Sequence, residues 1–384
     1  MIRKIKQAPM FALLTLFILL FTIADIAVPD KDIAEIENKV LSHIPSLSAA
    51  SILDGSWTKD YGVYVQDQFV MRDMWITSHS ALETEVLRKV ETGGMLLDTK
   101  SGMQYPRLFG LTDTETLQWE KNSAAFATFC GRHDGISVIF VPIASQLEGT
   151  SLPAGAPSID ENALMDSLLE MLPGDVRKLD LRKILADSSG STQIFYRNDH
   201  HWTTDGAELA YSAFCDKKAV IPDITLRREQ PGFLGTSYSK SRWAHAQPDS
   251  LVWYDLPAEM TIFQVAGENQ FIEKSRGGLY NSDALANYDK YAFFLHGNNG
   301  YSRIKGMGEG KILLIKDSLA NCFIPFLTEN YETIDVIDLR NYQYSPDSLI
   351  DSEKYDEILI LYGLQTLFTD TSIVNLNRPT TIKK

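Results

Sequence analysis

The chain is poor in cysteine, has no excess of basic residues and contains no internal repeat or low-complexity segment. Three cysteines in 384 residues (Cys130, Cys215 and Cys322) cannot close a disulfide framework, and their spacing matches no zinc site. Packing is therefore their expected role. Lysine and arginine number 36 against 50 acidic residues, which gives a net charge of −14. Phosphate backbones repel such a chain, which argues against nucleic acid as a partner.

The composition is that of a folded protein. Hydrophobic residues make up 44% of the chain, aromatic residues 10% and charged residues 22%. These proportions are sufficient for a buried core and exclude a disordered or collagen-like chain. The length allows two or three domains, or one large α/β domain with extensions.

One long hydrophobic run does occur, near the N-terminus. Arg3, Lys4 and Lys6 precede an apolar stretch over residues 8–24, and Asp25 is the first acidic residue. A basic flank followed by an apolar stretch is typical of a signal peptide or an uncleaved anchor. No clean cleavage site follows the run, so we favour a single-pass anchor that is short for a membrane span. The basic end should stay in the cytoplasm, which places the remaining chain outside the cell membrane.

Apolar runs of strand length alternate with helical patterns in the second part of the chain. We expect strands at Ile136–Pro142, Lys311–Ile315, Thr333–Leu339 and Glu357–Tyr362, and helices at Asp113–Cys130, Glu161–Leu172 and Thr204–Phe214. The earlier part predicts helices at Ile33–Ile44 and Trp75–Val90 and a strand at Met95–Leu97. The alternation indicates an α/β fold with a parallel sheet covered on both faces. We divide the chain into an anchor or signal (1–28), a mixed extension (30–111) and an α/β domain (112–384).

A polar segment with two histidines precedes the helix expected at residue 204. Side chains two apart in an extended segment point to the same side, so Asp199 and His201 should project together, with His200 opposite. A carboxylate beside an imidazole fixes its tautomer and stabilises the imidazolium that forms during base catalysis. The alternative is a polar loop whose histidines satisfy backbone groups. A metal site is disfavoured, because adjacent histidines rarely reach one ion.

A second candidate lies where the strand expected at 311–315 ends in Lys316-Asp317-Ser318. A serine at the carboxyl end of a strand and the start of a helix has backbone N–H groups nearby that can hold an oxyanion. The alternative is an ordinary helix cap. A serine nucleophile needs a base, and the base needs an orienting acid. Ser318, His201 and Asp199 supply one candidate for each role.

Further donors and cofactor motifs are less specific. Gly297, Asn298 and Asn299 form a turn whose N–H and amide groups could line an oxyanion hole, although a plain turn is the alternative. Met307–Gly310 lacks the lysine and serine of a phosphate-binding loop, so we expect neither a nucleotide nor any other cofactor.

The tetrapeptide Asp199-His200-His201-Trp202 resembles the motif after which the bacterial DHHW proteins are named. Other stretches resemble this family and the alginate O-acetyltransferase group of SGNH-hydrolase-like proteins: Asp67–Phe69 with Arg72-Asp73, Val141-Pro142, Gly232–Thr236, Lys316–Ser318 and Ile360–Gly363. The resemblance implies a three-layer α/β/α domain in which the Asp-x-His pair precedes the serine. It also implies Ser318 as nucleophile, His201 as base and Asp199 as orienting acid.

The resemblance also implies a role in the cell envelope. Proteins of this type act in the export and O-acetylation of cell-surface polysaccharides, many of them beside a membrane-bound O-acyltransferase. We therefore expect an anchored extracytoplasmic O-acyltransferase or esterase that forms an acyl-enzyme and has a polysaccharide acceptor. Trp202 and Tyr238 are candidates for stacking on sugar rings. Lys316 replaces the glycine of the usual Gly-Asp-Ser, which favours the alternative of a non-catalytic accessory or glycan-binding protein.

Overall fold

The computed structural model describes residues 9–147, 152–153 and 155–380. The basic flank of Arg3, Lys4 and Lys6 lies outside the described residues. The chain divides into two compact units, which are described separately. Unit 1 comprises residues 1–89 and 242–244, and unit 2 comprises residues 90–241 and 245–384. Residues 90–111, which the sequence assigned to the extension, pack within unit 2.

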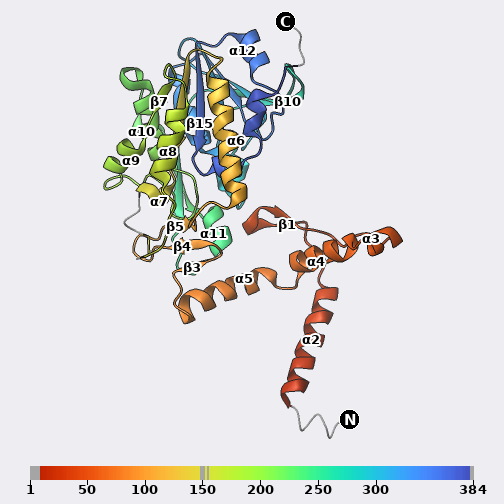
Figure 1. Cartoon of the computed structure of the whole chain (residues 1–384). Coiled ribbons are helices and arrows are strands. Elements are labelled where there is room, and N and C mark those ends of the chain that lie inside the picture. The colour runs from red at the N-terminus through yellow and green to blue at the C-terminus, as the bar shows by residue number, and fades with distance from the viewer. Residues whose placement is uncertain (1–8, 148–151, 154, 381–384) are drawn as a thin grey trace. The chain divides into compact units, whose positions relative to one another are not determined.

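The first described element of unit 1 is the helix α2 (Pro9–Ala27), formed by the apolar run (Figure 1). Within the described ranges, α2 is the one helix that is long and apolar enough to cross a membrane, and none of its membrane-length window is buried. Such a helix serves as a single-pass anchor or a signal sequence. The other elements of unit 1 are β1 (Ile33–Ala34), the 3₁₀ helix η1 (Glu35–Glu37), β2 (Lys39–Val40), α3 (Ala49–Leu53), α4 (Ser56–Gln68), α5 (Arg72–Ala81) and the π-helical η2 (Leu82–Val86).

The prediction of a helix at Ile33–Ile44 is wrong. This stretch forms the antiparallel pair β1–β2 around the short η1. Asn38 adopts a left-handed conformation (φ 46°), which ends the helical turn after three residues and reverses the chain. The helix expected at Trp75–Val90 is confirmed as far as residue 86, where η2 ends.

Unit 2 is built on an eight-stranded sheet in the order β11-β10-β12-β14-β13-β15-β6-β7. Its strands are β6 (Ile136–Val141), β7 (Arg177–Leu179), β10 (Glu259–Gly267), β11 (Gln270–Gly277), β12 (Tyr301–Lys305), β13 (Lys311–Lys316), β14 (Thr333–Ile337) and β15 (Glu357–Gly363). The strands from β14 to β7 are parallel, as expected for β6, β13, β14 and β15 from their apolar sequences. The short strand β7 was not predicted. Strands β12, β10 and β11 extend the sheet in antiparallel fashion.

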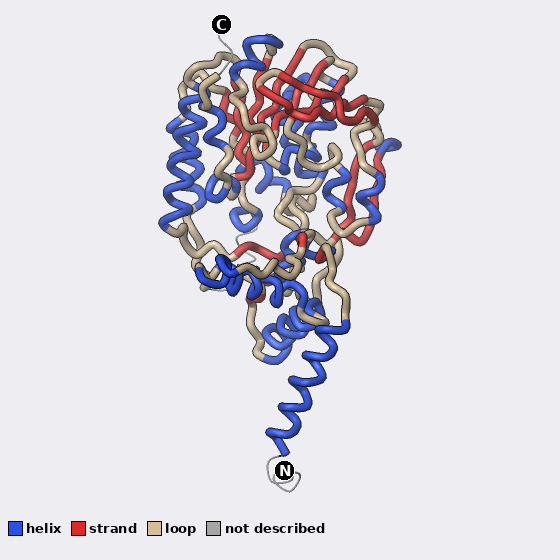
Figure 2. The backbone as a smooth tube through the Cα atoms, turned by 90° about the vertical axis from the view of Figure 1, so that its right-hand side faces the viewer, coloured by secondary structure: helices blue, strands red, loops and turns tan. Residues whose placement is uncertain are grey.

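Successive side chains of the central strands feed two hydrophobic clusters, one on each face of the sheet. Ile312 and Leu314 of β13 pack in the cluster that contains residues of α9 (Arg182–Ser188) and α10 (Thr204–Cys215). Leu313 and Ile315 pack in the cluster that contains residues of α6 (Asp113–Cys130) and α8 (Glu161–Met171). The tube in Figure 2 shows helices gathered around the strands of unit 2.

Smaller elements complete unit 2. The strands are β3 (Glu91–Thr92), β4 (Met95–Leu97), β5 (Gln104–Pro106), β8 (Arg227–Phe233) and β9 (Asp249–Tyr254); the helices are α7 (Ala144–Leu147), α11 (Thr236–Ser241), α12 (Asp347–Glu353) and α13 (Thr366–Thr369). The 3₁₀ helices among the described residues of this unit are η4 (Asp216–Lys218), η5 (Ile224–Leu226), η6 (Ser282–Ala286), η7 (Lys290–Phe293), η8 (Ser318–Cys322), η9 (Ile324–Glu329) and η10 (Ile373–Asn377). The strand expected at Met95–Leu97 is β4.

The first residue of α8, Glu161, has a buried carboxyl group, from which we predict that the stability of the fold depends on pH. Glu161 is 4% exposed, and the Ser145 hydroxyl donates to its Oε1 at 3.0 Å. Burial raises the pKa of Glu161 to about 7, and the Ser145 hydrogen bond offsets only part of this effect. The folded chain therefore keeps this proton at pH values where the unfolded chain has released it. The free energy of unfolding should fall by about 3 kcal/mol as the pH rises from 4.5 to 7.

Glu161→Gln should abolish this component of the pH dependence. The variant is expected to be more stable than the wild-type chain above pH 7, because the glutamine buries no charge. Urea unfolding at pH 4.5 and pH 7.5 measures the difference, with Glu120→Gln on the exposed side of α6 as a control that keeps the wild-type dependence. Equal pH dependence in the wild-type chain and Glu161→Gln would contradict the assignment.

Candidate active site

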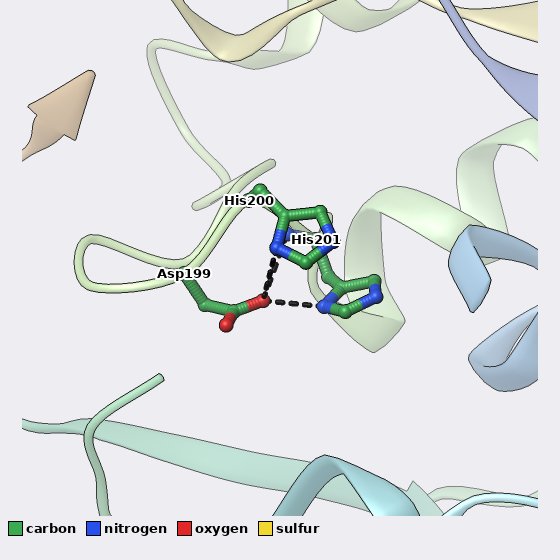
Figure 3. A group of neighbouring side chains, drawn as sticks. All are labelled: Asp199, His200 and His201. Atoms are coloured by element: carbon green, nitrogen blue, oxygen red, sulfur yellow. Dashed lines mark hydrogen bonds and ion pairs between the residues drawn. The ribbon is translucent and has the colours of Figure 1, made fainter. Parts of the chain in front are cut away.

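Asp199, His201 and Ser318 form one chain of hydrogen bonds in unit 2. Nδ1 of His201 bonds to Oδ1 of Asp199, and Nε2 of His201 lies 2.8 Å from Oγ of Ser318. Asp199 is 3% exposed and His201 5% exposed, while Ser318 is half-buried. A carboxylate can only accept, so Nδ1 donates to Asp199 and Nε2 is left to accept from the serine hydroxyl. Figure 3 shows the Asp199 carboxylate directed at the ring of His201, with the ring of His200 beside it.

The two histidines lie on a hairpin that leads directly into α10. Phe195 pairs with Trp202 in an isolated antiparallel bridge, so Asp199 lies in the turn between them. The Thr203 hydroxyl then accepts a hydrogen bond from the backbone N–H of Gly206 at 3.1 Å and caps the N-terminus of α10. The rigid start of the helix thereby fixes the position of the residues that precede it.

Trp202 joins the histidine hairpin to the serine turn. Its indole Nε1–H donates to the carbonyl of Leu319 at 2.7 Å, one residue beyond Ser318. The side chain has no exposed surface. The ring therefore has no face on which a sugar could stack. The structure does not support the expected contact between Trp202 and a sugar substrate. Tyr238, the other candidate for stacking, is half-buried.

The Asp199 carboxylate is held from its far side by Gly235 and Thr236. Oδ2 accepts hydrogen bonds from the backbone N–H of Thr236 at 2.7 Å and from its hydroxyl at 3.0 Å. Gly235 leaves the space for this contact, because a Cβ atom there would lie 2.1 Å from Oδ2. Burial alone would raise the pKa of Asp199, but attraction to His201 and His200 and these hydrogen bonds lower it well below its ordinary value.

Asp317 shapes the turn that presents Ser318. Its Oδ1 accepts from the backbone N–H of Leu319 at 2.9 Å. Its Oδ2 accepts from the backbone N–H of Gly363 at 2.8 Å and from the hydroxyl of Thr366 at 2.6 Å. The carboxylate thus ties the ends of the neighbouring parallel strands β13 and β15. Ser318 lies at the carboxyl edge of the sheet, as expected, and opens the short 3₁₀ helix η8.

Tyr291 covers the imidazole and has no counterpart among the sequence predictions. Its ring stacks on that of His201, with the centroids 3.7 Å apart and the planes 14° apart. Its hydroxyl donates to the backbone carbonyl of Ser318 at 3.2 Å. Burial raises the pKa of Tyr291 well above its ordinary value, so the phenol stays neutral. Tyr291 lies far from both motifs in sequence, and no pattern around it marks it.

Lys316, which replaces the glycine of the family pattern, is part of a buried polar network. The side chain is 2% exposed, and its Nζ donates to Oδ1 of Asn298 at 2.9 Å and to Oδ1 of Asn321 at 2.8 Å. Nζ also lies 3.3 Å from Oδ2 of Asp338, which pairs in addition with Arg340. Burial lowers the pKa of Lys316, and the attraction of Asp338 opposes this effect.

Replacement of this lysine should destabilise unit 2. Lys316→Met removes a donor to the amide oxygens of Asn298 and Asn321 and one of the two cationic partners of the buried Asp338 carboxylate, at an expected cost of about 3 kcal/mol. Chemical denaturation measures the loss. Lys305→Met on the exposed end of β12 is the matched control and should change stability by less than about 0.5 kcal/mol. A Lys316→Met protein as stable as this control would show that the network contributes nothing.

Two of the three expected oxyanion donors have acceptors within their own turn. The backbone N–H of Gly297 donates to the carbonyl of Phe294 at 3.0 Å, and Nδ2 of Asn299 donates to the carbonyl of Leu295 at 2.9 Å. Asn298, the third candidate, is exposed, and its amide group is not engaged in this way. Lys316 fixes its Oδ1, and its Nδ2 has no acceptor among the residues that the structure describes.

The same polar segment also contains potential metal ligands. One ligand atom from each of Asp199, His200 and His201 lies within 4.8 Å of the others. Both ring nitrogens of His201 are already engaged, one with Asp199 and the other with Ser318. A metal ion bound to His201 would therefore displace one of these hydrogen bonds. The arrangement fits proton transfer better than metal binding.

None of the three cysteines, all of which the structure describes, is suited to act as a nucleophile in addition to Ser318. Cys130 and Cys322 are buried and Cys215 is half-buried, and all three are free. Burial raises the pKa of each thiol to about 12, so the thiols stay protonated at neutral pH. Packing remains the role that their surroundings support.

A comparison with known families identifies the motif. Residues 153–337 match the model of the DHHW protein family. The resemblance to the DHHW family is confirmed. The matched DHHW segment contains Asp199, His201 and Ser318. No curated protein matches the sequence.

Solved structures also resemble this DHHW-like chain. A DHHW family protein from Eubacterium siraeum is 21% identical, with a TM-score of 0.62 over 75% of this chain and 96% of its own. Bacillus cereus PatB1, solved with a sulfonyl adduct, is 18% identical, with a TM-score of 0.58 over 74% of this chain and 98% of its own. The O-acetyltransferase domain of Pseudomonas putida AlgJ is 12% identical, with a TM-score of 0.42 over 72% of this chain and 93% of its own. The first two likenesses show a shared α/β fold.

Proposed function

We propose that this DHHW-like chain is an extracytoplasmic O-acyltransferase or esterase that acts through an acyl-enzyme on Ser318. The observation that carries this proposal is the hydrogen-bond chain from Asp199 through His201 to the Ser318 hydroxyl. Unit 2 would supply the catalytic domain, with the three-layer α/β/α arrangement of the SGNH-like hydrolases. The α2 helix would anchor the chain, with the remaining residues outside the membrane.

The geometry suggests how the first half of the reaction proceeds. Ser318 Oγ attacks the carbonyl carbon of an acyl ester or thioester, and Nε2 of His201 takes the serine proton. Asp199 accepts from Nδ1 and stabilises the imidazolium that forms. Collapse of the tetrahedral intermediate breaks the bond to the leaving group, which takes the proton from His201. The product is an ester between the acyl group and Ser318.

The second half repeats these steps with an acceptor hydroxyl. His201 removes the proton from the acceptor, which attacks the acyl carbonyl carbon and releases Ser318. A sugar hydroxyl of a cell-surface polysaccharide as acceptor gives transfer, and water gives hydrolysis. A membrane-bound O-acyltransferase is the proposed source of the acyl group. Tyr238 is the remaining candidate for contact with a sugar ring.

Donors for the oxyanion are proposed on two elements. The backbone N–H of Ser318 lies at the start of η8, where the first N–H groups of a helix have no intrahelical acceptor. Asn298 offers an amide nitrogen, because Lys316 holds its oxygen and thereby sets the orientation of the group. On this view Lys316 supports the reaction indirectly, and its departure from the glycine pattern does not disable the site.

Hydrolysis of p-nitrophenyl acetate by the full chain in detergent tests the proposal. The wild-type protein should release p-nitrophenol, and Ser318→Ala should fall to the uncatalysed rate. Ser167→Ala, which removes an exposed hydroxyl on α8, is the matched control and should retain wild-type activity. Equal rates in folded wild-type protein and Ser318→Ala would overturn the enzymatic proposal and favour the non-catalytic accessory role.

A further inference from the structure

An apolar stripe follows α5 and η2 in unit 1. Its large side chains are between 39% and 68% exposed: Met71, Met74, Trp75, Leu82 and Val86. Trp75, Leu82 and Val86 follow one another at spacings of seven and four residues, which places them along one side of the helix, and Met71 directly precedes it. A helix of a soluble protein turns such a stripe towards the core, whereas this one faces outward. An exposed stripe of this kind marks a surface for an apolar partner.

The stripe begins in direct contact with α2. The Phe21 ring of α2 stacks with Phe69 at a centroid distance of 6.3 Å and lies 5.6 Å from the ring of Trp75. The loop before α5 is also fixed to the helix, because the backbone N–H of Val70 donates to Oδ1 of Asp25 at 3.0 Å. Figure 1 shows α5 running across the direction of α2 within this unit.

The length of α2 sets the depth of these contacts. Its 19 residues span about 28 Å, against about 30 Å for the hydrocarbon core of a bilayer. Nearly every residue of α2 must therefore lie in the hydrocarbon if the helix crosses it. Phe21 precedes the end of the helix by six residues, or about 9 Å. Phe69 and Trp75 pack against Phe21 and share its depth.

We infer that α2 is retained as the anchor and that Phe69, Met74 and Trp75 enter the extracytoplasmic leaflet beside it. The partner of the stripe is thus lipid, and α5 lies along the membrane interface, where tryptophan is favoured. This arrangement also explains the contact of Asp25. A carboxylate in the last turns of a spanning helix is costly, and the Val70 N–H offsets part of that cost.

The charges next to the stripe are compatible with this position. Arg72 donates to both carboxylate oxygens of Glu37 at 2.9 and 2.8 Å. Lys39 pairs with Asp67 at the end of α4. Ion pairs cost less than single charges when they are brought to the headgroup region. The strongly acidic chain should avoid anionic headgroups, which makes a zwitterionic bilayer the suitable test surface.

Quenching of tryptophan fluorescence by brominated lipid tests the inference. The full chain is reconstituted in phosphatidylcholine vesicles with bromine atoms on the acyl chains. We expect these lipids to quench part of the wild-type emission, and we expect most of that part to be missing in Trp75→Phe. Trp253→Phe, which changes a tryptophan of unit 2, is the matched control and should leave the lipid-quenched part unchanged.

Two results would overturn the inference. In the first, brominated lipid quenches the emission of Trp75→Phe and of the wild-type chain to the same extent, and acrylamide, a water-soluble quencher, quenches Trp75. This result would mean that Trp75 is in water, and the stripe would then belong to a protein partner. The second is an intact mass of the membrane-extracted chain that lacks residues 9–27. Neither result depends on esterase activity, so neither result tests the proposed function.

Discussion

Asp199→Asn is expected to lower the turnover of an acetyl ester by about 10⁴-fold. The carboxylate accepts from Nδ1 of His201, which leaves Nε2 free to take the Ser318 proton. An asparagine would turn its carbonyl towards the N–H of Thr236 and its amide N–H towards Nδ1. Nε2 would then carry the proton and could no longer act as base. Rates of p-nitrophenyl acetate hydrolysis at saturating substrate measure the loss.

The neighbouring histidine provides the matched control for this variant. His200 bonds to the hydroxyl of Thr236 and its side chain is 42% exposed, outside the hydrogen-bond chain to the serine. His200→Ala should therefore change the rate by less than about tenfold. Equal losses in Asp199→Asn and His200→Ala would contradict the role given to Asp199. Thermal unfolding of both variants distinguishes the loss of a catalytic base from the loss of the folded structure.

Gly235→Ala is expected to disable the site although it touches neither the histidine nor the serine. The added Cβ would lie 2.1 Å from Oδ2 and 2.4 Å from Cβ of Asp199. The carboxylate must move, and its contact with His201 moves with it. We expect at least a 100-fold loss of turnover, since small displacements of catalytic groups have effects of this size. Overpacking should also lower stability by about 2 kcal/mol.

A second glycine separates the steric effect from a general effect of alanine. A Cβ on Gly278 would meet nothing within 4 Å, so Gly278→Ala should retain activity and stability. The two variants are compared by the same hydrolysis assay and by chemical denaturation. Full activity in Gly235→Ala would mean that Asp199 has room to shift without consequence, against the tight packing described above.

The sequence predicted the centre of the sheet better than its edge. Strands β6, β13, β14 and β15 are buried on both faces, so their continuous apolar runs stand out. The hairpin β10–β11 carries mostly exposed side chains on its outer strand and gives no such signal. The stretch Ile33–Ile44 has apolar spacing close to that of a helix, but the backbone reversal at Asn38 decides its structure.

The sequence also predicted which side chains meet at the site but not what holds them. Asp199, His201 and Ser318 stand out because their types suit one reaction and because two of them, Asp199 and His201, belong to one short motif. Gly235 and Tyr291 act by shape and by stacking, over separations of 36 and 90 residues from Asp199 and His201. Such contacts follow from the folded sheet and loops, and a single sequence carries no pattern for them.

Detection of the acyl-enzyme tests the central claim most directly. The full chain is mixed with p-nitrophenyl acetate, quenched in acid within the first turnovers and digested for peptide mass analysis. We predict one acetyl group on the peptide that contains Ser318, and none on that peptide in Ser318→Ala. Turnover by the wild-type chain with Ser318 unmodified, or an acetyl group that persists at another residue in Ser318→Ala with undiminished turnover, would contradict the account.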